Sequence, residues 1–107
     1  MATVVWTRPA HEEKDRFYLN GVLQFGVTVA NETAQRIQEI EKSLSRWPES
    51  GFPEPLLKGS FPIYRSKHIN KRYKLIYWYD ETKDTVVIED IWDTRRAPQN
   101  LVKRIKI

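Results

Sequence analysis

The first half of the chain has the hydrophobic pattern of a short strand followed by a helix. Thr3–Thr7 is a run of β-branched and aromatic residues, which predicts a strand. From Pro9 onward apolar residues recur at helical spacing, at Ala10, Phe17, Tyr18, Val22 and Phe25. Proline is favoured in the first turn of a helix, and Gly26 is suited to end one. The pattern predicts a first helix from Pro9 to about Phe25.

A second helix is predicted from a clearer apolar stripe. Its apolar side chains recur at steps of three or four, at Ala34, Ile37, Ile40, Leu44 and Trp47. Asn31 is suited to cap the N-terminus of this helix, and Pro48 ends it because a proline disfavours helix in the preceding residue. The spacing places Trp47 in the core. A short connection predicts that the two helices form an antiparallel hairpin.

The second half of the chain changes to the pattern of strands. Residues 48–62 contain four prolines and two glycines and are predicted to form an irregular loop. Ile63–Ile69, Tyr73–Tyr79 and Thr85–Trp92 are rich in Tyr, Trp, Ile and Val and are separated only by tight-turn segments. Such short connections exclude parallel crossovers, so an antiparallel meander is expected. The tail Leu101–Ile107 is compatible with a helix or a strand.

The order of these elements predicts the fold class. Strand, helix, helix and three strands indicate an α+β fold in which a two-helix hairpin packs on one face of an antiparallel sheet. A chain of 107 residues has room for a single core, so residues 1–107 are expected to form one domain.

Composition narrows the chemistry and the compartment. The chain has no cysteine, which excludes disulfides, a thiol nucleophile and thiolate metal sites. No segment has the length of a membrane span or the form of a signal peptide. A cytoplasmic location is therefore expected, with no membrane partner.

Positive charge is concentrated in the second half. Residues 1–55 carry six Lys or Arg against eight Asp or Glu, whereas residues 56–107 carry twelve against six. Phe61–Lys74 holds five basic residues and no acidic one, and the pair Arg95–Arg96 follows. Cations interleaved with tyrosines suit a phosphate backbone. The same cations also suit an acidic protein segment, or a charged strand edge that discourages aggregation.

Three phrases of the second half carry a family resemblance. They are the proline-rich loop before Tyr64–Lys67, the segment Tyr73–Tyr77 and the segment Thr85–Arg96. In this order the chain resembles the RelE/ParE superfamily, the toxins of bacterial type II toxin–antitoxin modules, from Val4 to about Ile105. The resemblance implies a compact toxin without cofactor or metal. It also implies an antitoxin protein that keeps the toxin inactive by wrapping a partly helical segment around it.

The superfamily contains two activities, and the resemblance leaves both open. RelE-like members enter the ribosomal A site and cut mRNA, whereas ParE-like members inhibit DNA gyrase and are not nucleases. A fold does not decide between such activities, because function depends on the site.

Basic residues would perform the chemistry of the RNA-cleaving branch. Attack by the 2′-OH needs removal of a proton, protonation of the leaving oxygen and stabilisation of the charged phosphorane, without a metal. The resemblance assigns these catalytic roles to Arg65, Lys67, Lys74 and Arg95. It assigns RNA or phosphate binding to Lys71, Arg72, Tyr73 and Arg96. A lysine among other cations has a lowered pKa and serves as a base, whereas arginine stays protonated and holds the anion.

One position departs from the ribonuclease pattern. The tyrosine near the C-terminus of that branch falls on Leu101, so a stacking or proton-transfer group is missing. His68 is the substitute that the sequence offers for proton transfer, but on an alternating strand it points away from Lys67. Asp90 and Asp93 are three residues apart and are expected on opposite faces, which argues against a paired-carboxylate mechanism.

Three hypotheses therefore remain, and all of them share an antitoxin encoded beside the toxin. The four basic positions favour a ribosome-dependent endoribonuclease that acts on mRNA, which is the interpretation preferred from the sequence. Leu101 favours a non-enzymatic gyrase inhibitor whose contact surface is the tail 97–107. A homologue that only binds an antitoxin is the third.

Overall fold

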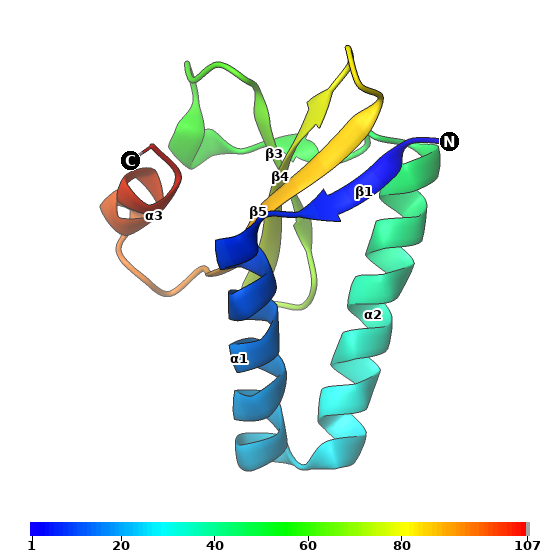
Figure 1. Cartoon of the computed structure of the whole chain (residues 1–107). Coiled ribbons are helices and arrows are strands. Elements are labelled where there is room, and N and C mark those ends of the chain that lie inside the picture. Colours follow the sequence, from blue (N-terminus) through cyan, green and yellow to red (C-terminus); the bar gives the residue numbers. More distant parts are fainter. Residues whose placement is uncertain (107) are drawn as a thin grey trace.

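The computed structural model describes residues 1–106, and the chain forms helices on both sides of a five-stranded sheet (Figure 1). The elements are β1 (Thr3–Trp6), α1 (Arg8–Phe25), α2 (Val27–Arg46), β2 (Phe52–Pro53), a 3₁₀ turn (Pro55–Leu57), β3 (Tyr64–His68), β4 (Tyr73–Asp80), β5 (Thr85–Asp93) and α3 (Pro98–Lys106). The predicted α+β order is confirmed, and the tail is a helix, although Ile107 lies outside the described residues. No helix within residues 1–106 is long and apolar enough to cross a membrane.

A single glycine joins the two long helices. The Thr7 hydroxyl caps α1 by accepting a hydrogen bond from the Ala10 N–H at 3.2 Å. Gly26 ends α1 as predicted, with a φ of 90° in the region that favours glycine. The predicted N-cap at Asn31 is wrong, because α2 begins directly after Gly26, and the Asn31 side chain accepts a hydrogen bond from the Tyr18 hydroxyl at 2.6 Å. The hairpin tip extends well beyond the sheet (Figure 1).

The apolar stripe of α2 is buried except at its C-terminal end. Ile37, Ile40 and Leu44 are buried, whereas the side chain of Trp47 is 63% exposed, so its predicted place in the core is wrong. Trp47 is the C-cap residue, with φ −129° and ψ 75°. This backbone has left the helical conformation, and helical spacing no longer decides where the side chain lies.

The sheet has the strand order β1-β5-β4-β3-β2. Strands β3, β4 and β5 form the predicted antiparallel meander. Strand β1 pairs in parallel with β5, which makes the sheet mixed, because the chain between these two strands is long enough for a crossover. Strand β2 adds two residues to the other edge, so the predicted loop over residues 48–62 is partly regular.

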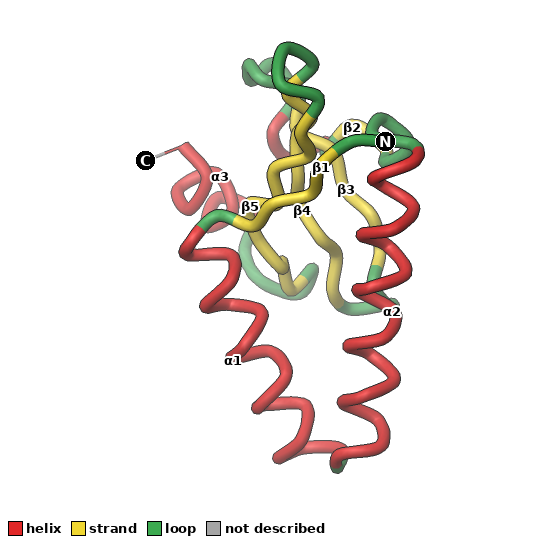
Figure 2. The backbone as a smooth tube through the Cα atoms, turned by 45° about the vertical axis from the view of Figure 1, so that its right-hand side comes forward, coloured by secondary structure: helices red, strands yellow, loops and turns green. Residues whose placement is uncertain are grey.

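Both faces of the sheet are covered, so β4 is buried from two sides. The α1–α2 hairpin packs on one face, here called the hairpin face, against residues that include Leu75 and Tyr77. The other face, here called the α3 face, carries Ile76 and Trp92 under Leu57 and Leu101. Figures 1 and 2 show the hairpin and α3 on different sides of the strands. The hairpin layer is confirmed, whereas the α3 layer was not predicted.

We expect Leu101→Ala to lower the free energy of unfolding by about 2–5 kcal/mol, because it removes buried methyl groups and leaves a cavity. The side chain of Leu101 is 0% exposed, whereas that of its neighbour Val102 is 36% exposed. Val102→Ala is therefore the matched control and should change stability by about 0.5 kcal/mol or less. Urea unfolding followed by tryptophan fluorescence measures both, and equal effects would contradict the docking of α3.

Candidate functional site

Strand register separates the predicted catalytic residues. Arg65 and Lys67 of β3 pair with Tyr77 and Leu75 of β4, which belong to the hairpin-face core. Lys74 of β4 pairs with Trp92 of the α3-face cluster. Paired residues on neighbouring strands point to the same face. Lys74 therefore lies on the opposite side of the sheet from Arg65 and Lys67.

Lys74 is one half of a buried ion pair. Its ammonium contacts Oε1 of Glu54, and the two side chains are only 12% and 0% exposed. The second carboxylate oxygen of Glu54 accepts a hydrogen bond from the Leu56 N–H at 3.0 Å. Buried charges lose their hydration and need such a partner. Lys74 thus anchors the segment after β2 to the centre of the sheet.

Arg65 is also engaged within the chain. Its guanidinium donates to the Gly51 carbonyl at 3.0 Å and lies 3.4 Å from Oε2 of Glu49. The Tyr77 hydroxyl fixes the same loop by accepting a hydrogen bond from the Gly51 N–H at 2.8 Å. Burial raises the pKa of Tyr77, which keeps this hydroxyl protonated. Arg65 and Tyr77 therefore hold the loop after α2 against the sheet.

Arg95 is held by a carboxylate of its own turn. Its Nε and Nη2 donate to Oδ1 and Oδ2 of Asp93 at 3.1 and 2.9 Å, and its backbone N–H donates to Oδ1 at 3.0 Å. These hydrogen bonds from Arg95 lower the pKa of Asp93 below its usual range, so the carboxylate is charged at neutral pH. Lys67 differs, since it makes no ion pair within residues 1–106.

The predicted phosphate-binding residues do come together, at the end of the sheet formed by two loops. Lys71 and Arg72 lie in the β3–β4 turn, and Arg95 and Arg96 follow β5. The N–H and the hydroxyl of Thr94 both donate to the Arg72 carbonyl, at 2.7 and 2.9 Å. These bonds tie the two loops together. The four cations Lys71, Arg72, Arg95 and Arg96 are called the basic end below.

Two further contacts fix the basic end. The Asn70 side-chain oxygen accepts hydrogen bonds from the backbone N–H groups of Arg72 and Tyr73, both at 2.9 Å. The guanidinium of Arg96 lies over the ring of Trp92, 5.0 Å from its centroid. Asn70 and Thr94 were not predicted as site residues, although an Asn in a tight turn is a recognisable signal for this type of cap.

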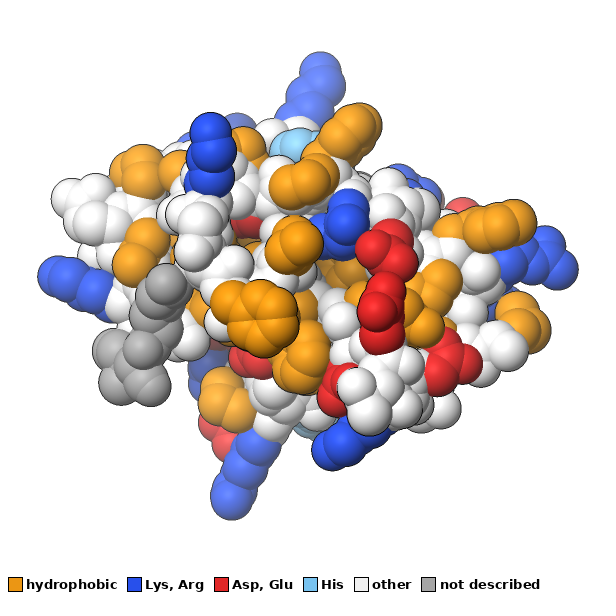
Figure 3. Space-filling view, turned by 90° about the horizontal axis from the view of Figure 1, so that it is seen from above, with side chains coloured by type: hydrophobic (Ala, Val, Ile, Leu, Met, Phe, Trp, Pro, Cys, Tyr) orange, Lys and Arg blue, Asp and Glu red, His pale blue; other side chains and the backbone are white. Residues whose placement is uncertain are grey.

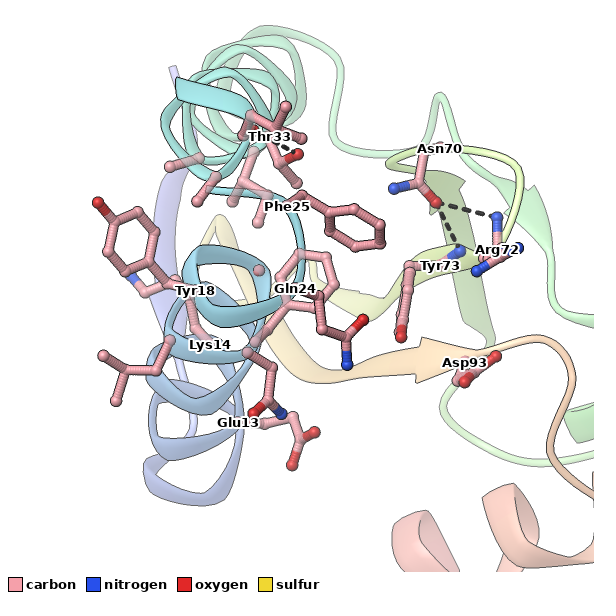
Figure 4. Close-up of a pocket in the computed structure, with 18 of the residues that line it drawn as sticks. Glu13, Lys14, Tyr18, Gln24, Phe25, Thr33, Asn70, Arg72, Tyr73 and Asp93 are labelled. Carbon is pink, nitrogen blue, oxygen red and sulfur yellow. Dashed lines mark hydrogen bonds between the residues drawn. The ribbon is translucent and has the colours of Figure 1, made fainter. Parts of the chain in front are cut away.

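A groove of about 1290 Å³ runs from the basic end along the helical hairpin. Its apolar lining includes Phe17, Phe25, Val29 and Ile37. Figure 4 shows Phe25 at the end of α1 and Tyr73 on β4 pointing into this space from opposite sides, with Arg72 and Asp93 beside Tyr73. Phe25, one of the apolar residues at helical spacing in α1, is 59% exposed. These apolar side chains face solvent beside the basic end.

The C-terminal helix is fastened on the other side of the sheet. Arg104 donates from Nε and Nη2 to the two carboxylate oxygens of Asp90, both at 2.7 Å. Burial raises the pKa of Asp90, and the hydrogen bonds from Arg104 oppose this shift. Asp90 pairs with Ile76 of the α3 face, and Asp93 pairs with Tyr73, which packs on the hairpin face. The prediction that the two carboxylates lie on opposite faces is therefore confirmed. Leu101, the position at which the ribonuclease branch carries a tyrosine, is buried on the α3 face.

Comparisons with known proteins give a consistent result. The family model of the ParE toxin of type II toxin–antitoxin systems, parDE, matches residues 4–98. No curated protein matches the chain.

Solved structures share the fold at low sequence identity. The chromosomal ParDE system of P. aeruginosa superposes with a TM-score of 0.67 at 22% identity, over 87% of this chain and 96% of that one. A YoeB/ParE toxin from Agrobacterium tumefaciens gives 0.59 at 19% identity, over 85% and 97%. The heterotetrameric YoeB–YefM complex from Staphylococcus aureus gives 0.55 at 22% identity, over 84% and 93%.

We expect Glu54→Gln to lower the free energy of unfolding by about 3–5 kcal/mol, because it leaves the Lys74 ammonium buried without a counter-charge. The double variant Glu54→Leu with Lys74→Met should recover most of this loss, since it removes both charges. Chemical denaturation measures the two variants. Wild-type stability of Glu54→Gln would show that the pair is not buried as described.

Proposed function

Because the chain belongs to the ParE toxin family of type II toxin–antitoxin systems, we propose that this toxin acts by binding DNA gyrase and does not cleave RNA. The observation that carries the proposal is the position of Lys74. This predicted catalytic lysine is buried against Glu54, on the opposite face of the sheet from Arg65 and Lys67.

Metal-independent RNA cleavage needs a base and several phosphate-binding cations around one scissile bond. Arg65 and Lys74 already neutralise acids of the chain from two different faces, and Arg95 is held by Asp93. The position at which the ribonucleases carry a tyrosine is Leu101, which is buried. These features leave the catalytic set incomplete.

A binding toxin needs an exposed surface of suitable shape, and the chain has one. The groove combines apolar side chains such as Phe17 and Phe25 with cations on two linked loops at one end. Such a surface has the composition of protein interfaces, in which aromatic residues and arginine are enriched. It supports action through a protein complex.

The proposal includes an antitoxin partner. The solved relative from Staphylococcus aureus is a heterotetrameric toxin–antitoxin complex. By analogy we propose that the small protein encoded next to this chain binds it and keeps it inactive.

Ribosome-dependent cleavage of mRNA remains a second candidate, because part of the predicted set does share a face. Lys67 and Tyr73 both lie on the hairpin face, near the basic end. Lys67 makes no ion pair within the described residues, so its ammonium is available to a phosphate of RNA.

Two assays on the purified toxin separate these activities. We expect inhibition of gyrase supercoiling, together with intact mRNA in a cell-free translation reaction. New mRNA 5′ ends at A-site codons, absent when ribosomes are omitted, would establish the ribonuclease and overturn the proposal. Unimpaired supercoiling and translation would indicate a homologue that only binds an antitoxin.

Lys67→Ala tests the same choice in cells. We expect this variant to arrest growth as the parent chain does, because a single half-buried cation that makes no ion pair within the described residues contributes little to stability or to a large interface. Growth curves after induction measure the effect. A loss of toxicity of about 100-fold or more without loss of folding would indicate that Lys67 acts as a base in RNA cleavage.

A further inference from the structure

The basic end contains an acidic side chain that the proposed function does not explain. Asp93 ends β5 among the four cations and makes three hydrogen bonds to Arg95. One of them, from the backbone N–H, shapes the turn. The other two occupy the forked face of the guanidinium, which is the face that binds carboxylates and phosphates.

The groove beside this cluster indicates a polypeptide ligand. Apolar side chains of α1 and α2 such as Phe17, Phe25 and Ile37 line it together with polar and acidic ones, a mixture that suits the side chains of a polypeptide better than a sugar–phosphate backbone. Tyr73, which lines the groove, packs edge-on against Phe17 with ring centroids 4.7 Å apart. An amphipathic segment fits this surface, with apolar residues in the groove and carboxylates at the basic end.

The two loops that carry the cations are held together before any ligand arrives. The bonds from Thr94 to the Arg72 carbonyl and from the turn to Asn70 fix the backbone of both loops. Loops that are already ordered lose little conformational entropy when a ligand binds. The opposite end of the molecule differs: Figure 3 shows basic side chains scattered singly over that face and acidic ones close together.

We propose that Asp93 is an internal competitor for the ligand of the groove. Its carboxylate occupies Arg95 in the isolated toxin, and a carboxylate of the antitoxin segment takes its place when the groove is filled. The inference rests on the proposed function, which supplies the antitoxin. Asp93 acts as a positioning residue: it keeps Arg95 folded back and reduces the positive charge that the partner meets.

Asp93→Asn tests this directly. Asparagine retains the side-chain oxygen that accepts the Arg95 N–H, but it removes the charge. We expect the variant to bind the antitoxin about 3–10-fold more tightly, with a steeper loss of affinity between about 50 and 300 mM NaCl, because the groove meets the partner with more positive charge. Biolayer interferometry with the immobilised neighbouring antitoxin measures this, and thermal melts check the fold.

A charge-reversal pair provides the second arm. Arg72→Glu with Arg96→Glu should weaken antitoxin binding by about 10–100-fold, because two like charges would then face the partner carboxylates. Lys83→Glu in the β4–β5 turn is the matched control at the other end of β4, and it should leave the affinity unchanged.

The outcomes distinguish the inference from the proposed function. Weaker binding by Asp93→Asn would show that Asp93 contacts a basic group of the partner, and equal effects of the reversal pair and Lys83→Glu would remove the basic end from the interface. Either result overturns the inference while the complex persists. Displacement of the antitoxin by a 20-nucleotide duplex would also overturn it, in favour of a phosphate ligand. Absence of any complex with the parent chain would refute the antitoxin partner itself.

Discussion

The burial of β4 on both of its faces is the constraint on which the rest of the structure depends. Leu75 and Tyr77 pack under the helical hairpin, and Ile76 packs under α3 and the 3₁₀ turn. A charged side chain that enters such a sheet loses its hydration and requires a counter-charge. The buried pair of Lys74 and Glu54 satisfies this requirement, as does Asp90 with Arg104. Charge within the sheet is therefore part of the scaffold.

The same constraint decides where the chain can offer charge to a partner. Cations that are fixed yet exposed remain where the strands end, in the β3–β4 turn and after β5. Thr94 joins these two loops, and the groove along α1 and α2 opens beside them. We propose that this groove and its basic end form a surface for a protein, consistent with a toxin that acts and is silenced through protein complexes.

The sequence predicts most of the fold, because local patterns decide most of it. The meander follows from turns too short for crossovers, and Gly26 marks the end of α1. The prediction that Trp47 is buried was wrong, because helical spacing does not determine the direction of a side chain beyond the end of the helix. The site was harder to predict. Local motifs identified Lys74 and Arg95 as cations. Only the strand register and the tertiary partner Glu54 show that Lys74 is neutralised, and only the conformation of the turn after β5 shows that Asp93 holds Arg95.

Hydrogen–deuterium exchange of the toxin alone and in complex with its antitoxin tests the central claim most directly, that partners bind at the groove and its basic end. The account predicts new protection in the β3–β4 turn, in residues 93–97 and along the C-terminal half of α1. The exposed loop that carries Phe52 and Phe61 should exchange as before. Protection confined to that loop, with unchanged exchange around the groove, would contradict the account.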